Sequence, residues 1–178
     1  MEVSSKDTQS IGTPSGRVRP AAPERAQLPA ADRSTSYWSS AALAARFLGA
    51  LSLLAVGAVH LQQYEYLYSA ISTIGTLFLL NFAGATALGL GLLAPIERLL
   101  GRVGGFVVAL LALGGVGLAG TAFTFLLVAE RTPLFGFQEP GYDPPALMAS
   151  RIAELVTMGL LGSFLAVRLA SRSSARRW

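Results

Sequence analysis

The chain has no cysteine and a single histidine, His60, and only 13% of its 178 residues are charged. Without cysteine, disulfide bonds, thiolate metal sites and cysteine nucleophiles are excluded. One histidine argues against a zinc site and against haem held by two histidines, so we expect no cofactor. No nucleophile–base or metal-binding set is visible along the chain. We therefore expect a protein that is not an enzyme.

Long apolar stretches are what the sequence has instead of these groups, since 52% of its residues are apolar. The three intervals without any charge are residues 47–64, 66–96 and 103–129. A helix needs about 20 apolar residues to cross roughly 30 Å of hydrocarbon. Backbone groups within a membrane must be hydrogen-bonded inside their own segment, which favours helices. A fourth apolar stretch, residues 148–167, carries two charges near its start.

These stretches predict an all-α membrane protein, an antiparallel four-helix transmembrane bundle with a disordered N-terminal tail. The expected spans are residues 42–64, 70–94, 104–129 and 145–170, within a transmembrane domain of residues 39–170. Pro95 should end the second helix, and Pro145 is favourable in the first turn of the fourth. Residues 1–38 are rich in Pro, Ala, Ser and Arg without an apolar period, which predicts a disordered cytoplasmic tail. Residues 171–178 should form a basic cytoplasmic tail.

The positions of the basic residues predict the orientation in the membrane. Both tails and the connection around residues 98–102 contain arginine, whereas the first connection, HLQQYEYLYS, contains none. Both termini should therefore be cytoplasmic in a multi-pass protein of the cell (plasma) membrane, although Arg131 and Arg151 in the third connection oppose this bias. The net charge of +4 then fits anionic lipid headgroups on the cytoplasmic side better than nucleic acid. A membrane-protein partner or a second copy of the chain stays open.

Polar residues gather at the outer end of the expected bundle, where we expect any recognition to occur. The candidate functional cluster consists of His60, Glu65, Glu139, Arg151 and Glu154. The tyrosines of the first connection and the aromatic residues of TPLFGFQEPGYDPP are typical of an interfacial aromatic belt. The alternative is that the second of these segments forms a compact lid over the mouth of the bundle.

Glu154 is the strongest individual signal in this cluster. Only 13 residues separate it from the basic end of its helix, from Leu155 to Val167, and they span only about 20 Å. Glu154 must therefore enter the apolar layer, where a carboxylate is a functional candidate. Residues 150, 157, 161 and 162 share its helix face and suggest that this face points into the bundle. The alternative is a structural ion pair with Arg151 or Arg131.

His60 shares a helix face with Gly49 and Gly57, which implies the close approach of another helix. The first and last helices are neighbours in a closed four-helix bundle. We therefore expect His60 and Glu154 to approach each other and form a coupled pair. The alternative is that His60 bonds only a backbone carbonyl.

The second helix offers packing signals but no chemistry. Asn81 lies near its middle, and an interhelical hydrogen bond is its expected role. Ala83, Ala87 and Gly91 follow at four-residue spacing and predict a seam that packs against another helix.

One run, GAVHLQQYEYLYSAISTIGTLFLLNFAGA, resembles small four-span integral membrane proteins of high-GC Gram-positive bacteria. In these proteins a His-Leu pair ends the first helix, a Tyr-containing connection follows, and Ile-Gly-x-Leu-Phe-Leu-Leu-Asn opens the second. LFGFQEPGY followed by a Glu early in the fourth helix is similar as well. The likeness covers most of residues 45–165 and implies a fold but no activity. The matching positions are His60, Leu61, Tyr64, Gly75, Leu77, Phe78, Asn81, Phe135, Gly136, Glu139 and Glu154.

Two functions from different classes fit these observations. The first is a structural or accessory subunit of a membrane complex, favoured by the lack of a catalytic constellation. The second is an ion- or proton-coupled binding or transport unit that uses the outer His/Glu cluster.

Overall fold

Every regular element among the described residues is a helix. The computed structural model describes residues 30–139, 141 and 143–175, with side chains described from residue 39 to residue 173 apart from residues 140 and 142. The elements are α1 (Ala30–Gln63), η1 (Tyr64–Tyr68, a π-helical turn), α2 (Ser72–Leu93), α3 (Ile96–Leu100), α4 (Gly104–Ala129) and α5 (Pro144–Ala175). The predicted all-α class is confirmed, and the short helix α3 and the π-helical turn are additions that the sequence did not reveal.

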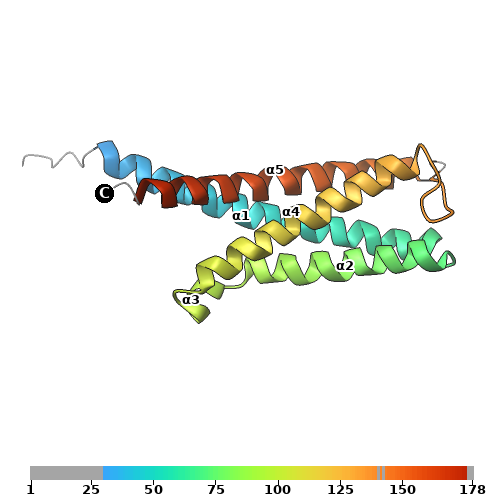
Figure 1. The fold of residues 1–178 in the computed structure, drawn as a ribbon, viewed down its shortest axis with the longest axis horizontal. Coiled ribbons are helices and arrows are strands. Elements are labelled where there is room, and N and C mark those ends of the chain that lie inside the picture. Colours follow the sequence, from blue (N-terminus) through green and yellow to red (C-terminus); the bar gives the residue numbers. More distant parts are fainter. Residues whose placement is uncertain (1–29, 140, 142, 176–178) are drawn as a thin grey trace, which may run out of the picture.

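The four long helices run antiparallel to their chain neighbours (Figure 1). α1 packs against α2 and α5, and α4 packs against α2 and α5, so the first and last helices are neighbours as expected. The start of α1, the end of α5 and helix α3 lie at one end of the bundle, here called the termini end. The η1 turn and the α4–α5 loop lie at the other end, the loop end.

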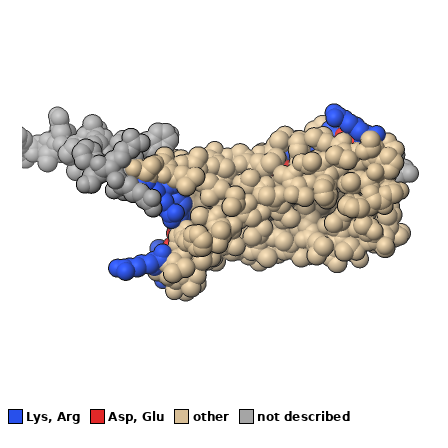
Figure 2. Space-filling view, in the orientation of Figure 1, with Lys and Arg blue, Asp and Glu red and all other residues tan. Residues whose placement is uncertain are grey.

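All four long helices are long and apolar enough to cross a membrane. The candidate spans cover residues 39–68, 72–93, 104–129 and 144–173. On the face seen in Figure 2, the basic side chains gather at the two ends, and most of the surface between them carries no charged groups. Large apolar side chains such as Leu80 and Phe106 are exposed between the ends, as contact with lipid requires. These are the features of a multi-pass membrane protein.

The helix ends agree with the proline positions but not with the predicted tail boundaries. α2 ends at Leu93, just before Pro95, and α5 begins at Pro144. α1 begins at Ala30, inside the segment predicted as tail, and α5 continues to Ala175, beyond the predicted end of the transmembrane domain. Extension of an existing helix is cheap compared with starting one, so a span can continue into flanking polar sequence. Residues 1–29, for which disorder is predicted, lie outside the described residues. The last residues of the basic tail, 176–178, lie outside them as well.

Small residues allow close helix packing toward the termini end and the middle of the bundle. Gly49 lies against Leu161 of α5, and a Cβ atom there would be 2.5 Å from its Cδ2 atom. The close approach predicted for this face of α1 is therefore confirmed. The seam predicted on α2 holds only at Gly91, where a Cβ atom would be 3.0 Å from Leu111 Cδ1 of α4. Ala83 and Ala87 are exposed, and the residues that pack inside are Ala85 and Gly89. Almost every residue of α2 is apolar or small, so its lipid-facing and protein-facing rows resemble each other in sequence.

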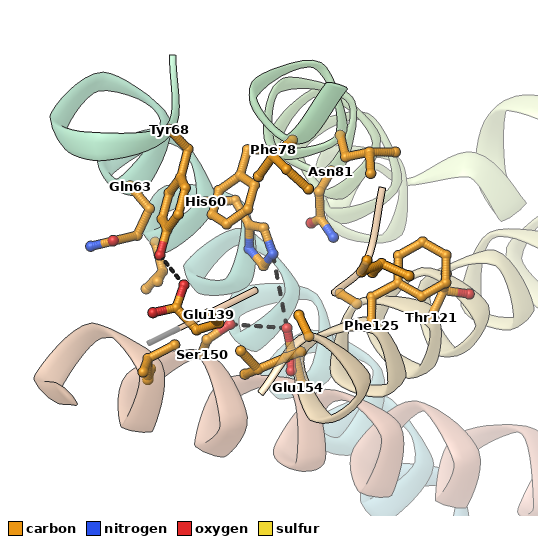
Figure 3. A pocket seen from close by; sticks show the side chains of 18 of the residues that line it. His60, Gln63, Tyr68, Phe78, Asn81, Thr121, Phe125, Glu139, Ser150 and Glu154 are labelled. Carbon is orange, nitrogen blue, oxygen red and sulfur yellow. Dashed lines mark hydrogen bonds and ion pairs between the residues drawn. The ribbon is translucent and has the colours of Figure 1, made fainter. Parts of the chain in front are cut away.

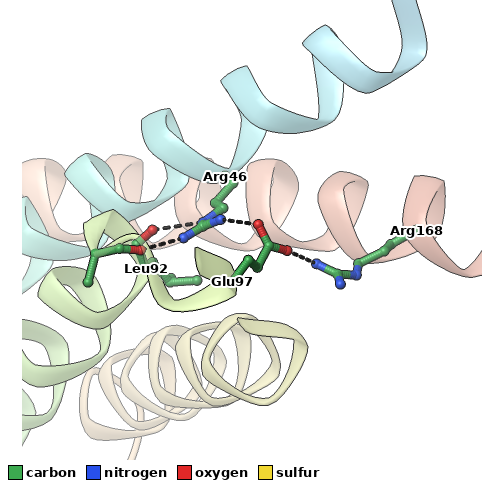
Figure 4. Close-up of polar contacts among 5 residues, drawn as sticks. Arg46, Leu92, Glu97 and Arg168 are labelled. Carbon is green, nitrogen blue, oxygen red and sulfur yellow. Dashed lines mark hydrogen bonds and ion pairs between the residues drawn. The ribbon is translucent and has the colours of Figure 1, made fainter. Parts of the chain in front are cut away.

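Arg46 fixes the termini end of the bundle (Figure 4). Its Nε atom donates to the Leu92 carbonyl at 2.8 Å and its Nη2 atom to the Ala94 carbonyl at 2.8 Å. Its Nη1 atom lies 3.1 Å from Glu97 Oε2, and Arg168 binds the other oxygen of the same carboxylate at 2.9 Å. One arginine of α1 therefore caps the end of α2 and, through Glu97, connects α1 with α3 and α5.

Candidate functional site

The π-helical turn η1 brings Tyr68 back toward the bundle. The first span was predicted to end at residue 64, but the helix of α1 continues through Tyr64–Tyr68 with wider turns. Tyr68 is consequently buried, while Tyr66 stays 81% exposed. The aromatic belt expected here is therefore divided, with one tyrosine on the surface and another inside. Single π turns of this kind often occur at functional sites.

Three rings from η1, α1 and α2 contact one another in a row at the loop end (Figure 3). Phe78 of α2 lies between the two others, with its ring centre 4.6 Å from Tyr68 and 5.1 Å from His60. This contact orients the imidazole of His60, which is 8% exposed. Stacked aromatic side chains have few accessible rotamers, so this wall of the site is preorganised.

His60 makes a hydrogen bond to a backbone carbonyl, which the sequence analysis gave as the alternative to pairing with Glu154. Its Nδ1 atom lies 2.8 Å from the Val56 carbonyl oxygen. A carbonyl only accepts, so the hydrogen belongs on Nδ1. In the neutral imidazole, Nε2 then carries a lone pair that is free to face the site.

Glu154 lies opposite this Nε2 atom, on α5 (Figure 3). The carboxylate is 1% exposed, and its Oε1 atom lies 4.0 Å from His60 Nε2. Ser150 Oγ donates to the same oxygen at 2.9 Å. The second oxygen, Oε2, is buried and has no hydrogen-bond partner among the described residues. The expected approach of His60 to Glu154 is thus present, and the carboxylate keeps an unused acceptor.

The arginines considered as partners of Glu154 bind elsewhere or are exposed. Arg151 binds the carboxylate of Glu130 at the end of α4, and Arg131 is exposed. The alternative considered for Glu154, a structural ion pair with one of these arginines, is therefore not the arrangement found. The face predicted from the helical spacing is correct, since Ser150, Thr157 and Leu161 are all buried with Glu154.

Side-chain hydrogen bonds hold α1 against α5 next to this pair. Ser52 Oγ donates to the Ala153 carbonyl at 2.9 Å. Thr157 Oγ1 donates in turn to Ser52 Oγ at 3.0 Å. These contacts fix the separation of the two helices beside Glu154 and about two turns from His60, so the pair does not depend on its own attraction.

The α4–α5 loop folds over the loop end as a lid. Leu134 and Phe137 exchange two backbone hydrogen bonds of 2.7 and 3.0 Å, which close a tight hairpin. Phe135 and Gly136 at its tip have φ angles of 52° and 80°. Both angles are positive, as in a type I′ turn, and this conformation is strained for phenylalanine. Phe135 is 58% exposed, whereas Phe137 packs edge-on against Tyr68 with ring centres 5.6 Å apart.

Glu139 anchors this lid from inside. Its backbone N–H donates to the Ala129 carbonyl at 2.9 Å, and its carboxylate accepts from Gly141 N at 2.8 Å. The hydroxyl of Tyr68 donates to the same carboxylate. A second link joins Gln63 of α1 to Asp143 at 2.8 Å. The α4–α5 loop therefore lies over the mouth of the bundle, as the lid alternative predicted.

Beneath the lid, the bundle forms a partly open cavity of about 230 Å³. Its lining comes from α1, η1, α2, α4, α5 and the lid. The polar side chains of the lining are His60, Gln63, Tyr68, Asn81, Thr121, Glu139, Ser150 and Glu154. The rest of the lining is apolar. Of the predicted cluster, His60, Glu139 and Glu154 line the cavity, whereas the exposed Glu65 and the paired Arg151 do not.

Asn81 belongs to the site rather than to a helix–helix contact. Its Oδ1 atom is buried and accepts no hydrogen bond from the described residues, so the interhelical bond expected there is not formed through this atom. Tyr68, Ser150 and Thr121 also line the cavity. Ser150 could be placed from its helical spacing to Glu154, but the inward position of Tyr68 depends on the π turn, which has no recognised sequence pattern.

Comparison with known proteins finds no matching family model, no matching curated protein and no matching solved structure. Among the described residues, no group of three or more His, Cys, Asp or Glu side chains could hold a metal ion.

Proposed function

We propose that this membrane protein binds a small molecule in the cavity beneath the lid, with Glu154 and His60 as its polar anchor. The observation that supports this most is the buried Oε2 atom of Glu154, which lacks a partner within the described chain. Burial of a carboxylate without full pairing costs several kcal/mol. An apolar side chain of similar size would pack α5 without this cost, so the carboxylate fits a recognition role.

This proposal corresponds to the binding or transport unit that the sequence offered as its alternative. The anchor lies inside the candidate membrane spans, where ionisable side chains commonly mark substrate or ion pathways. The distribution of basic residues predicts that the termini end is cytoplasmic, so the lid would face the outside of the cell membrane. The resemblance to small four-span proteins of high-GC Gram-positive bacteria stays a prediction.

The test uses phenethyl alcohol, a neutral probe with an apolar body and one hydroxyl donor for the anchor, and the thermal unfolding of the purified protein in detergent. A ligand at a hundredfold excess over its dissociation constant stabilises a protein by about 2.7 kcal/mol. For a chain of this size, the midpoint should rise by roughly 5–10 °C. The Ala122→Phe variant, which fills the cavity wall, should lose this shift, and Ala87→Phe on the exposed face of α2 should keep it.

A shift that is equal in all three proteins would come from the micelle and would contradict the proposal. The absence of a shift in the wild type would contradict it as well.

An accessory subunit of a membrane complex is the second candidate. The exposed face of α5 carries Gly159, Ser163 and Ala166, and a Cβ atom at Gly159 would meet nothing within 4 Å. Small residues let another helix approach closely in a membrane. Mild solubilisation and co-purification test this role. A stoichiometric partner that is lost from a Gly159→Leu variant would favour it over ligand binding.

A further inference from the structure

We infer that the ligand of this cavity is a lipophilic amine, an apolar body that carries one ammonium group. This inference rests on the proposed function and adds the chemical class of the ligand.

The lining of the cavity is acidic. Two carboxylates, Glu139 and Glu154, line the cavity, and none of the described lining residues is lysine or arginine. The basic side chain nearest in sequence, Arg151, is paired with Glu130. A cavity walled by low-dielectric protein with only acidic charges attracts cations and repels anions.

The polar atoms at the anchor are hydrogen-bond acceptors. Glu154 Oε2 and Asn81 Oδ1 are buried without partners in the described chain, and His60 Nε2 presents a lone pair because Nδ1 is bonded to Val56. Nε2 and Glu154 Oε1 lie 4.0 Å apart. One ammonium nitrogen at about 2.9 Å from each atom would bridge them. A ligand that supplies donors therefore complements this end of the cavity, whereas a ligand with acceptors alone does not.

The remaining lining is apolar and therefore fits a ligand whose main part is apolar. Phe78, Phe125 and Phe137 contribute aromatic walls, which attract both an aromatic ring and an adjacent cation. An apolar cavity of about 150 Å³ accommodates benzene. By proportion, the 230 Å³ available here accommodates about nine non-hydrogen atoms. This size corresponds to an aromatic ring with a short aminoalkyl chain and is too large for a bare metal ion.

The cavity lies close to the lipid-facing surface. Leu80 of α2 and Phe125 of α4 line it and are also 61% and 37% exposed. α2 and α4 diverge toward the loop end (Figure 1), and these two side chains face both the cavity and the outer surface of the bundle. An amphiphilic amine concentrates in the membrane with its charge at the interface. Such a ligand would reach the anchor from the bilayer.

The test compares three probes with similar skeletons on the purified protein: phenethylamine, which is protonated at neutral pH, phenethyl alcohol and hydrocinnamate. We expect the amine to bind at least tenfold more tightly than the alcohol, and the carboxylate not to bind measurably. Glu154→Gln should abolish the preference for the amine while leaving alcohol binding within about threefold. Glu65→Gln, which removes an exposed carboxylate near the same end, should keep the full preference.

Alcohol binding that equals or exceeds amine binding in the wild type would overturn the inference while leaving the cavity as a binding site. An amine preference that survives in Glu154→Gln would overturn it too. If the Glu154→Gln protein does not fold, the ranking of the three probes on the wild type and on Glu65→Gln still decides the ligand class. If none of the three probes binds the wild type, both the inference and the proposed function fail.

Discussion

Replacement of Arg46 with methionine should destabilise the bundle strongly, although Arg46 lies far from the cavity. The Leu92 carbonyl depends on Arg46, because Pro95 interrupts the helix and the N–H of Ile96 bonds to Ala94 instead. Loss of Arg46 leaves this carbonyl unpaired at a cost of about 1–3 kcal/mol. The Ala94 carbonyl keeps Ile96 as a partner and contributes less.

The total expected loss is about 2–4 kcal/mol of unfolding free energy. The ion pair with Glu97 adds little to this figure, because the Glu97 side chain is 45% exposed and exposed pairs contribute about 1 kcal/mol or less. Arg46→Lys should be intermediate, since an ammonium group lacks the planar fork that reaches three acceptors at once.

Equilibrium unfolding in mixed micelles of increasing dodecyl sulfate content, followed by far-ultraviolet circular dichroism, measures these differences. The matched control is Arg98→Met, because Arg98 is exposed on α3 and has no side-chain hydrogen bond or ion pair with the described residues. This control should stay within about 0.5 kcal/mol of the wild type. If Arg46→Met is as stable as Arg98→Met, the capping role of Arg46 is refuted.

Three further predictions concern the pair, the packing and the orientation. In a double-mutant cycle, His60→Ala and Glu154→Gln should be additive within about 0.5 kcal/mol in unfolding free energy, because two acceptors 4.0 Å apart make no bond, and a coupling of about 1 kcal/mol or more would mean that the pair shares a proton. Gly115→Ala should lower the unfolding midpoint because its Cβ would be 2.7 Å from a Leu161 methyl, whereas Gly117→Ala, with nothing within 4 Å, should raise it slightly through helix propensity. A lone cysteine at Gln138 should react with an impermeant thiol reagent on intact cells, and protection of that cysteine would invert the orientation.

The sequence alone determined the class of the protein and the number of its candidate spans. Runs of apolar residues longer than the hydrocarbon layer leave helices as the natural structure, so four spans follow from composition and length. The inward face of Glu154 was also predictable, because Ser150 and Thr157 share its helical spacing and are too polar for a lipid-facing row.

Other features depended on contacts between segments far apart in the chain. The choice between the two partners that the sequence offered for Glu154, His60 or a nearby arginine, was one of these, since Arg151 is one turn away in sequence but binds Glu130 across the loop. Packing of α1 against α5, with Ser52 and Thr157 bonded between them, brings His60 to the carboxylate instead. Helical spacing shows which face of a helix is polar, but it does not show which other helix meets that face.

The cavity itself was decided by tertiary structure. It exists because the small residues at Ala50, Ala85 and Ala112 let the helices pack closely around the middle and the termini end, while α2 and α4 diverge beneath the lid. The π turn that directs Tyr68 inward adds one wall, and the lid residue Glu139 closes the top. Local sequence determines which segments become helices, whereas the volume left between them depends on how all four pack at once.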